Sequence, residues 1–222
     1  MINHELPEML RCVECGKGNL EFSPEKNELF CTSCSAEFPV RYNVPLLIKS
    51  KTTPGKPAVS EIHRKHGTIF NYIDHYQKDA IEYDYFAERD RETEHIDRRV
   101  REYISDKIPE KKGVILDVGC GNAWVAKYFC PPGHKVVSMD ISLENTSEAL
   151  KKYPYKNHSA IVGDVYSLPF KKHTFDYIVA SEVIEHLVSP EVSVKNLFSI
   201  LKPGGILIIT TTYREKIQYS LC

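Results

Sequence analysis

The 222-residue sequence lacks a long hydrophobic run, and no apolar stretch approaches the ~20 residues that a membrane-spanning helix needs. It also lacks an excess of one charge: 29 Lys and Arg stand against 30 Asp and Glu, so composition gives no general attraction to nucleic acid or to an anionic membrane. The amino terminus, with Glu5 and Glu8, does not have the pattern of a secretory signal. These absences predict a cytoplasmic protein without a membrane partner.

Cysteine is not scarce, but it is unevenly distributed. Four of the seven cysteines form two C-x-x-C pairs separated by fifteen residues: Cys12, Cys15, Cys31 and Cys34. This spacing is typical of a four-thiolate zinc site, which a reducing cytosol favours over disulfides. Residues 1–50 are too few to bury a large core, so we expect zinc to supply the folding free energy of a small zinc-ribbon module. The zinc is expected to be structural, because four thiolates leave no open coordination position.

A glycine-bearing turn follows the first strongly apolar strand, within residues 114–126. Asp117 lies near the carboxyl end of this strand, where α/β sheets bind ligands, and Gly119 and Gly121 allow close approach of the backbone. The pattern D-x-G-x-G-x-A differs from the dinucleotide fingerprint G-x-G-x-x-G, since the acid would repel a phosphate and suits a cation. It resembles motif I of the class I S-adenosylmethionine-dependent methyltransferases, which more often have a third glycine at the position of Ala123. The resemblance implies S-adenosylmethionine, which carries a sulfonium and an amino group, as the cofactor.

Strands and helices alternate after this motif, which predicts an α/β, Rossmann-like, doubly wound and mostly parallel sheet over residues 113–222. The strand at 135–140 ends in Asp140, nineteen residues after Gly121, a distance that suits a carboxylate bound to a ribose diol. The strand at 159–164 ends in a third acid.

Residues 163–170 read G-D-x-x-x-L-P-F, which resembles the adenine site of the same family. The resemblance implies that Asp164 accepts a hydrogen bond from the adenine amino group and that the Val165 amide donates one to the ring. It also implies that Ile141 packs on the face of the ring. Three acids at successive strand ends are harder to explain as helix caps than a single one.

The next buried strand, within residues 174–187, delivers four polar side chains toward the expected methyl-transfer point: Ser181, Glu182, Glu185 and His186. Ser181 is predicted to help bind the cofactor. His186 is the best candidate for a general base, since imidazole titrates near neutral pH. The E-x-x-E-H arrangement resembles the divalent-metal site of small-RNA terminal 2′-O-methyltransferases and of some ubiquinone-pathway O-methyltransferases. The same arrangement also occurs in methyltransferases where it binds no ion, so metal binding by Glu182, Glu185 and His186 stays one of two alternatives.

The remaining segments frame this core. Residues 51–60 have the composition of a linker. Residues 61–112 are predicted to be helical and are rich in tyrosine. By resemblance this region caps the cofactor, whereas for any single tyrosine the favoured interpretation is packing of the helices on the sheet. The family's sheet usually has seven strands, so a fifth strand at 206–212 predicts a sheet truncated there. An exposed edge strand can pair with another strand, so we expect a second copy of the chain or a partner chain to cover it.

The acceptor of the methyl group is the least determined part. Residues 36–48 resemble the small zinc proteins that activate tRNA and protein methyltransferases, and a zinc module ahead of the core also resembles the ribosomal-RNA guanine-N1 methyltransferases. Residues 1–60, however, balance seven Lys and Arg against seven Glu, whereas a phosphate-binding face usually has a basic excess. The sequence predicts a methyltransferase acting on an oxygen or nitrogen of RNA or of a small metabolite. The alternative is an inactive or truncated methyltransferase-like scaffold that binds cofactor or partner.

Overall fold

The computed structural model describes residues 2–49 and 72–212 of the chain. The predicted linker at 51–60, the first residues of the predicted cap and the segment 213–222 lie outside the described residues. None of the helices in the described part has the length and apolarity needed to cross a membrane.

The amino-terminal part is a short helix followed by four antiparallel strands. These elements are α1 (Leu6–Met9), β1 (Leu20–Ser23), β2 (Glu28–Cys31), β3 (Glu37–Arg41) and β4 (Val44–Leu47). The turn between β3 and β4 is tight because Tyr42 and Asn43 both adopt positive φ, at 53° and 67°, which matches the twist of paired strands.

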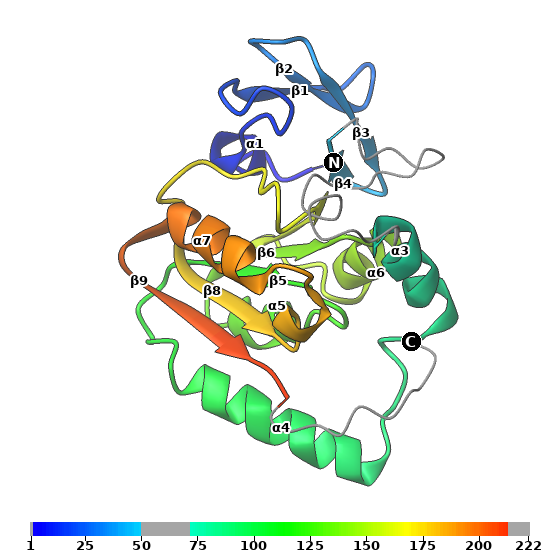
Figure 1. Cartoon of the computed structure of the whole chain (residues 1–222), viewed down its shortest axis with the longest axis vertical. Helices are drawn as coiled ribbons and strands as arrows, with labels where there is room; N and C mark the ends of the chain where they lie inside the picture. Colours follow the sequence, from blue (N-terminus) through cyan, green and yellow to red (C-terminus); the bar gives the residue numbers. More distant parts are fainter. Residues whose placement is uncertain (1, 50–71, 213–222) are drawn as a thin grey trace.

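The rest of the described chain alternates strands and helices, as predicted. Its elements are α3 (Tyr72–Glu82), α4 (Arg91–Ser105), β5 (Val114–Val118), α5 (Trp124–Phe129), β6 (Lys135–Asp140), α6 (Leu143–Lys152), β7 (His158–Gly163), β8 (Phe175–Ser181), the 3-10 helix η2 (Ile184–His186), α7 (Pro190–Ile200) and β9 (Leu201–Thr210). Strands β7-β6-β5-β8-β9 lie side by side in this order and are all parallel. The predicted Rossmann-like, mostly parallel α/β core is therefore confirmed (Figure 1).

Helices cover both faces of the core sheet because buried residues alternate along each strand. Ile115 and Val136 pack with α4 and α5 on one face, whereas Leu116 and Val137 pack with α7 on the other. The apolar residues of α1 and of β1–β4 join the cluster on the α7 face. The fold is thus doubly wound, and the amino-terminal part contributes to one of its two cores.

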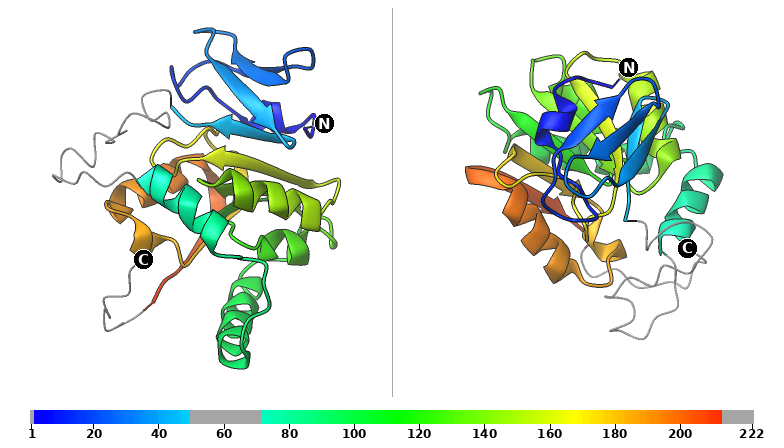
Figure 2. Two further views of the ribbon diagram at one scale, coloured as in Figure 1. Left: turned by 90° about the vertical axis from the view of Figure 1, so that its right-hand side faces the viewer. Right: turned by 90° about the horizontal axis from the view of Figure 1, so that it is seen from above.

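The amino-terminal strands continue the core sheet. Strand β4 pairs in parallel with β7, with Leu46 opposite Val162 and Leu47 opposite Gly163. The full order is β1-β2-β3-β4-β7-β6-β5-β8-β9. Figure 2 shows the four blue strands extending the molecule at the end opposite α4. The expected zinc module is therefore joined to the core edge to edge.

Helix α6 begins after Ser142, whose side chain accepts hydrogen bonds from the Glu144 and Asn145 amides as a cap. One local expectation needs adjustment. The fifth core strand was expected at 206–212, yet β9 pairs with β8 from Leu201 onward. The intervening Pro-Gly-Gly segment forms an irregularity in the register, where Gly204 has a φ of 78°, so the strand resumes instead of starting there.

Candidate functional site

Three acidic residues predicted to bind the cofactor lie at the carboxyl ends of adjacent strands. Asp117 is in β5, Asp140 ends β6 and Asp164 directly follows β7, and these three strands are neighbours in the sheet. All three side chains are buried, with exposed fractions of 3%, 9% and 6%. Parallel strands bring their carboxyl ends to the same edge, so sequence order alone was enough to place the acids together.

Asp117 is the unusual member of this group. Among the residues that the structure describes, its Oδ2 is the only buried side-chain nitrogen or oxygen without a hydrogen-bond partner. Burial raises the pKa of Asp117 well above its usual range, and the nearby Asp140 carboxylate raises it further. An unpaired buried carboxylate is unfavourable unless a donor or cation joins it. This atom therefore fits a ligand that carries a positive charge and N–H donors.

Both carboxylate oxygens of Asp140 accept hydrogen bonds from residues around it. Its Oδ2 accepts a hydrogen bond from the Gly121 amide at 3.2 Å and one from the Asn145 side chain at 3.4 Å, while Oδ1 accepts one from the Ser142 amide at 3.0 Å. Burial raises the pKa of Asp140, and the Ser142 and Gly121 amides partly offset that rise. Sequence reasoning missed Asn145, although its position shortly after the predicted strand at 135–140 was a usable signal.

The residues expected around adenine share the next strand end. Asp164 Oδ1 accepts a hydrogen bond from the Tyr166 amide at 2.9 Å, and the Asp164 carbonyl accepts one from Ser167 at 2.9 Å, which closes a tight loop. Val165 is buried and Ile141, which follows β6, is half-buried. Their roles toward adenine remain predictions, but all lie at the same sheet edge.

The two glycines of the turn are needed for different reasons. Gly119 has a φ of 63°, and a Cβ there would lie 2.6 Å from Val183 Cγ2, so neither its conformation nor its surroundings admit a side chain. Gly121 has a φ of 45° and faces the ring of Tyr85, which would lie 3.2 Å from an added Cβ. Ala123 also adopts positive φ, at 52°, which explains why glycine suits this position.

Tyr85 and α3 form a cover over the turn that sequence reasoning identified only as a group of tyrosines. The Tyr85 hydroxyl donates to Asp79 Oδ2 at 2.8 Å. Burial, followed by the Asp79 carboxylate, raises the pKa of Tyr85, and Asp140 contributes to the rise. Within α3, the ring of Tyr76 packs edge-on against His186, with ring centroids 5.8 Å apart. Helix α3 and the turn after it thus reach both His186 and the glycine turn.

The polar residues after β8 lie at the same edge but are more exposed. The Ser181 hydroxyl is hydrogen-bonded to Thr210 Oγ1 of β9 at 2.8 Å. Glu182 has a φ of 54°, a strained conformation for a residue with a side chain, and its amide donates to the Thr210 carbonyl. Burial, together with the Glu185 carboxylate, raises the pKa of Glu182. Glu185 and His186 are exposed in η2, so they are available to an incoming acceptor.

The four cysteines of the amino-terminal part converge on one point. Their sulfur atoms all lie within 4.8 Å of one another, and Cys12–Cys34 and Cys15–Cys31 are each 3.7 Å apart. Four thiolates bound tetrahedrally at a Zn–S distance of about 2.3 Å would be about 3.8 Å apart, so the geometry fits zinc. A disulfide would need about 2.05 Å.

Backbone amides support the thiolates as expected for a metal centre. The Gly18 amide donates to Cys15 Sγ and the Ser33 amide donates to Cys31 Sγ, each at 3.3 Å. Among the described residues, no other set of three or more His, Cys, Asp or Glu side chains brings its ligand atoms this close together. Glu182, Glu185 and His186 do not form such a set, and metal binding by them stays a hypothesis.

Comparison with known proteins identifies relatives of the segment that carries the sheet-edge residues. Residues 116–209 match the family described as "Methyltransferase domain". This match covers less than half of the 222-residue chain. The matched range begins in β5 and ends in β9, so the matched segment includes the glycine turn, the three acids and the residues after β8.

Two curated relatives illustrate the likeness. The chain is 34% identical to the mitochondrial ubiquinone biosynthesis O-methyltransferase of Bos taurus, over 48% of this chain and 30% of the relative. It is 33% identical to the demethylmenaquinone methyltransferase of Streptomyces griseus subsp. griseus, over 50% of this chain and 47% of the relative. The chain thus spans between about a third and a half of the length of these relatives.

The fold is also seen in a solved structure. The PH0226 protein of Pyrococcus horikoshii OT3 is 27% identical, with a TM-score of 0.50, over 56% of each chain. This likeness agrees with the parallel order of strands β7-β6-β5-β8-β9.

Proposed function

We propose that the chain binds S-adenosylmethionine at the carboxyl ends of β5, β6 and β7 and transfers its methyl group to an oxygen or nitrogen nucleophile. When bound, the cofactor would supply an electrophilic methyl group on a sulfonium. Asp117 would receive the amino group, Asp140 the ribose hydroxyls, and Asp164 and the Val165 amide the adenine, with Ile141 against the ring. Gly119 and Gly121 would let the backbone approach, and Ser181 would line the far end of the site.

The observation that carries this proposal is the unpaired Oδ2 of Asp117. A second buried acid, Asp140, stands close enough to raise the Asp117 pKa, so the pair concentrates negative charge in a dry site. A phosphate group would be repelled there, whereas a cationic ligand relieves both carboxylates. The positions of these acids within the methyltransferase domain agree with this ligand.

Methyl transfer from a sulfonium is an in-line displacement, so the protein mainly needs to align the nucleophile. His186 is the proposed general base, because it is exposed beside the methyl-transfer edge and its ring is oriented by Tyr76. Glu182 and Glu185 would then hold acceptor hydroxyls or amines near it. The names of the relatives include O-methyltransferases, which favours an oxygen acceptor.

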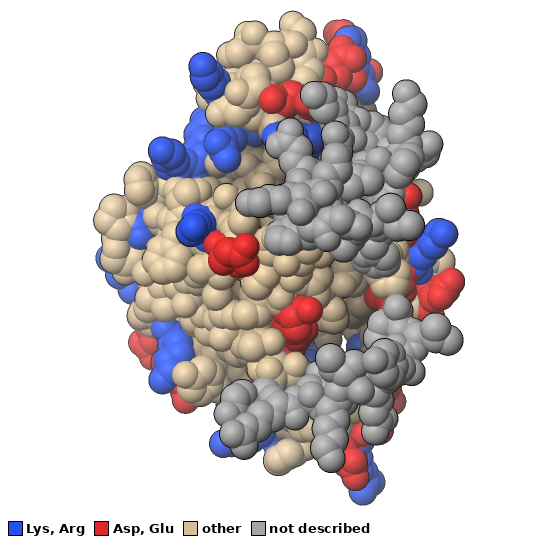
Figure 3. All heavy atoms as spheres, viewed as in Figure 1, with Lys and Arg blue, Asp and Glu red and all other residues tan. Residues whose placement is uncertain are grey.

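Both RNA and a small metabolite remain acceptor classes in this proposal. Figure 3 shows basic side chains gathered where the amino-terminal strands meet the core. Arg11 and Lys171 lie at this junction, since the Arg11 amide donates to Pro169 and the Lys171 amide donates to Met9. A basic junction next to the expected adenine end supports RNA as an acceptor.

Transfer of a labelled methyl group tests the proposal. The full chain, incubated with methyl-labelled S-adenosylmethionine and a cell extract, is expected to label one fraction among RNA, protein and small metabolites. A His186→Ala variant should lose most of this transfer, about 10²-fold or more for a general base, while retaining cofactor affinity in calorimetry. Heat of binding without any transfer would instead support the scaffold alternative, and absence of heat would reject the cofactor.

Cofactor binding is also expected to release protons. The pKa values of Asp117 and Asp140 are raised in the free protein, and a positively charged ligand lowers them again, so binding favours the ionised carboxylates. Affinity should therefore increase as pH rises through the raised pKa values. Calorimetry in buffers of different ionisation enthalpy measures the released protons. Proton uptake, or affinity that falls as pH rises, would contradict the proposed site.

We also propose that Cys12, Cys15, Cys31 and Cys34 bind one structural zinc ion. The sulfur distances, the closed four-thiolate set and the amide donors of Gly18 and Ser33 support zinc. Metal analysis of the purified chain should give one zinc per chain. A second divalent ion at Glu182, Glu185 and His186 is tested by a chelator that leaves the four-thiolate zinc in place. If this second ion takes part in catalysis, methyl transfer should stop in the chelator. Undiminished methyl transfer would reject the second ion.

A further inference from the structure

The segment of residues 164–171, called here the adenine loop, is held by the amino-terminal module from two sides. It begins where β7 ends, and β7 is paired with β4 at its last residues, Val162 and Gly163. At its far end, Phe170 forms an antiparallel bridge with Leu10. The module therefore contacts both β7, which precedes the adenine loop, and the last residues of the loop.

Hydrogen bonds fix the second contact. The Arg11 amide donates to the Pro169 carbonyl, and the Lys171 amide donates to the Met9 carbonyl, both at 2.9 Å. The Arg11 side chain adds a longer bond from Nε to the Leu168 carbonyl at 3.4 Å. These bonds join residues about 157 positions apart in the chain, so they exist only if the module is folded.

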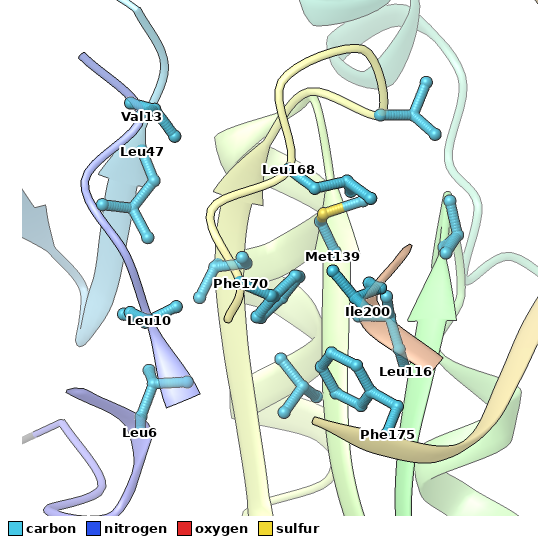
Figure 4. Close-up of a cluster of buried hydrophobic side chains, with 14 of the residues drawn as sticks. Leu6, Leu10, Val13, Leu47, Leu116, Met139, Leu168, Phe170, Phe175 and Ile200 are labelled. Atoms are coloured by element: carbon cyan, nitrogen blue, oxygen red, sulfur yellow. The ribbon is translucent and has the colours of Figure 1, made fainter. Parts of the chain in front are cut away.

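Apolar packing connects the same parts. Leu10 and Phe170 are both fully buried, and Val165 of the adenine loop belongs to the same cluster. Figure 4 shows Leu6, Leu10 and Leu47 of the module facing Phe170 across the boundary, with Met139 and Leu116 of the core beyond it. One continuous core therefore extends from the module into the sheet below the cofactor edge.

The metal ligands belong to this connection. Cys12 and Cys31 are buried members of the cluster, with exposed fractions of 0% and 2%. Cys12 directly follows Arg11, whose amide holds Pro169. A small module of this kind depends on its metal for folding. Loss of the metal would unfold the segment before Cys12. The hydrogen bonds that Met9 and Arg11 make with Lys171 and Pro169 at the far end of the adenine loop would then be lost.

We propose that metal bound by the four cysteines fixes the adenine loop in the conformation that binds cofactor, so that metal occupancy and cofactor affinity are thermodynamically linked. The cofactor part of this inference rests on the function proposed above. Linkage is reciprocal, so the cofactor also tightens metal binding by the same factor. The module then acts as a positioning element for the adenine end of the site, separate from any contact it makes with an acceptor.

Hydrogen exchange of the full chain tests the inference without needing the cofactor. Three samples are compared: zinc-loaded protein, protein stripped by a chelator, and stripped protein with zinc restored. Exchange of the Lys171 amide and its neighbours in the adenine loop is expected to rise about tenfold or more on stripping, since two backbone hydrogen bonds are lost, and to return with zinc. The Cys34→Ser variant should behave like the stripped protein. S-adenosylmethionine affinity should fall about tenfold or more in both.

The control is Cys130→Ala, which removes a buried thiol from the other core cluster and leaves the four-thiolate set intact. It should retain zinc and the slow exchange of Lys171. The inference is overturned if stripping leaves the adenine loop unchanged, or if the amides of Cys120 and Ala123 in the glycine turn exchange faster to the same extent, which would indicate general loosening. Absence of cofactor binding to either form would reject the proposed function, while the exchange comparison would still decide the coupling.

Discussion

The Asp117→Asn variant is expected to be more stable than the natural protein without cofactor and to bind S-adenosylmethionine more weakly. Asparagine has a similar shape but no charge, so it removes the buried carboxylate whose Oδ2 has no partner. We expect a gain of about 1–3 kcal/mol in the free energy of unfolding near pH 7 to 8, the usual penalty of an unsatisfied buried group. The affinity should fall roughly 10- to 150-fold, because a hydrogen bond between two charged groups contributes about 1.5–3 kcal/mol.

The dependence of this gain on pH follows from the direction of the pKa shift. The pKa of Asp117 is raised in the folded protein, so the folded state binds a proton more tightly than the unfolded state, whose aspartates titrate near about 3.9. The natural protein therefore loses stability as pH rises from that value through the folded pKa, whereas the asparagine variant does not. The difference in unfolding free energy should be largest above the folded pKa and should vanish below about pH 4. Denaturant unfolding at several pH values measures it.

Asp176 provides a matched control with the opposite sign. Burial would raise its pKa, but hydrogen bonds from the Lys202 ammonium and the Val114 amide outweigh burial and lower it. Its stabilising effect is thus present above the unfolded pKa and is lost as pH falls through the folded one. Asp176→Asn should destabilise the protein near pH 7 without changing cofactor affinity. If Asp117→Asn also destabilises it near pH 7, the unpaired carboxylate is not the functional feature inferred here.

The contrast between these two aspartates shows what could be predicted from sequence. Both aspartates lie in strands. Only the spacing of Asp117 from Gly119 and Gly121 indicated that it lies at the edge of the sheet where the carboxyl ends of parallel strands meet. The unpaired state of its Oδ2 depends on which side chains come near, and no local pattern contains that information. The same limit applies to Tyr85, which reaches Gly121 from the turn after α3, far earlier in the chain.

The pairing of β4 with β7, which joins the amino-terminal strands to the core sheet, could not be predicted from the sequence. Strand β4 lies within the segment 36–48 that resembles small zinc proteins, but its partner β7 lies more than 110 residues later. Pairing over such a separation depends on the whole fold, and a linker-like composition at 51–60 suggested a separate module. By contrast, the convergence of the four cysteines could be predicted from local spacing, because two C-x-x-C turns can bring four sulfurs together once a hairpin closes between them.

The final prediction concerns Gly16 and Gly18, two glycines that closely follow the first pair of cysteines. A Cβ on Gly18 would lie 2.1 Å from Cys31 Sγ, whereas a Cβ on Gly16 would meet nothing within 4 Å. Gly16 has a φ of 72°, so Gly16→Ala should add only about 1–2 kcal/mol of backbone strain. Because metal binding and folding of the module are linked, that strain weakens apparent zinc affinity about 5- to 30-fold.

Gly18→Ala is expected to have a much larger effect. Its methyl group would occupy the position of a ligand sulfur, and the backbone cannot move away freely, because the Gly18 amide donates to Cys15 Sγ and its carbonyl accepts from the Cys12 amide. We expect zinc affinity to fall by more than the 10- to 100-fold typical of changes around, but not in, a metal's ligand set. Competition with a chromophoric chelator measures both variants. Equal affinities for Gly16→Ala and Gly18→Ala would contradict metal binding by Cys31, since its sulfur makes by far the tightest contact that separates the two glycines.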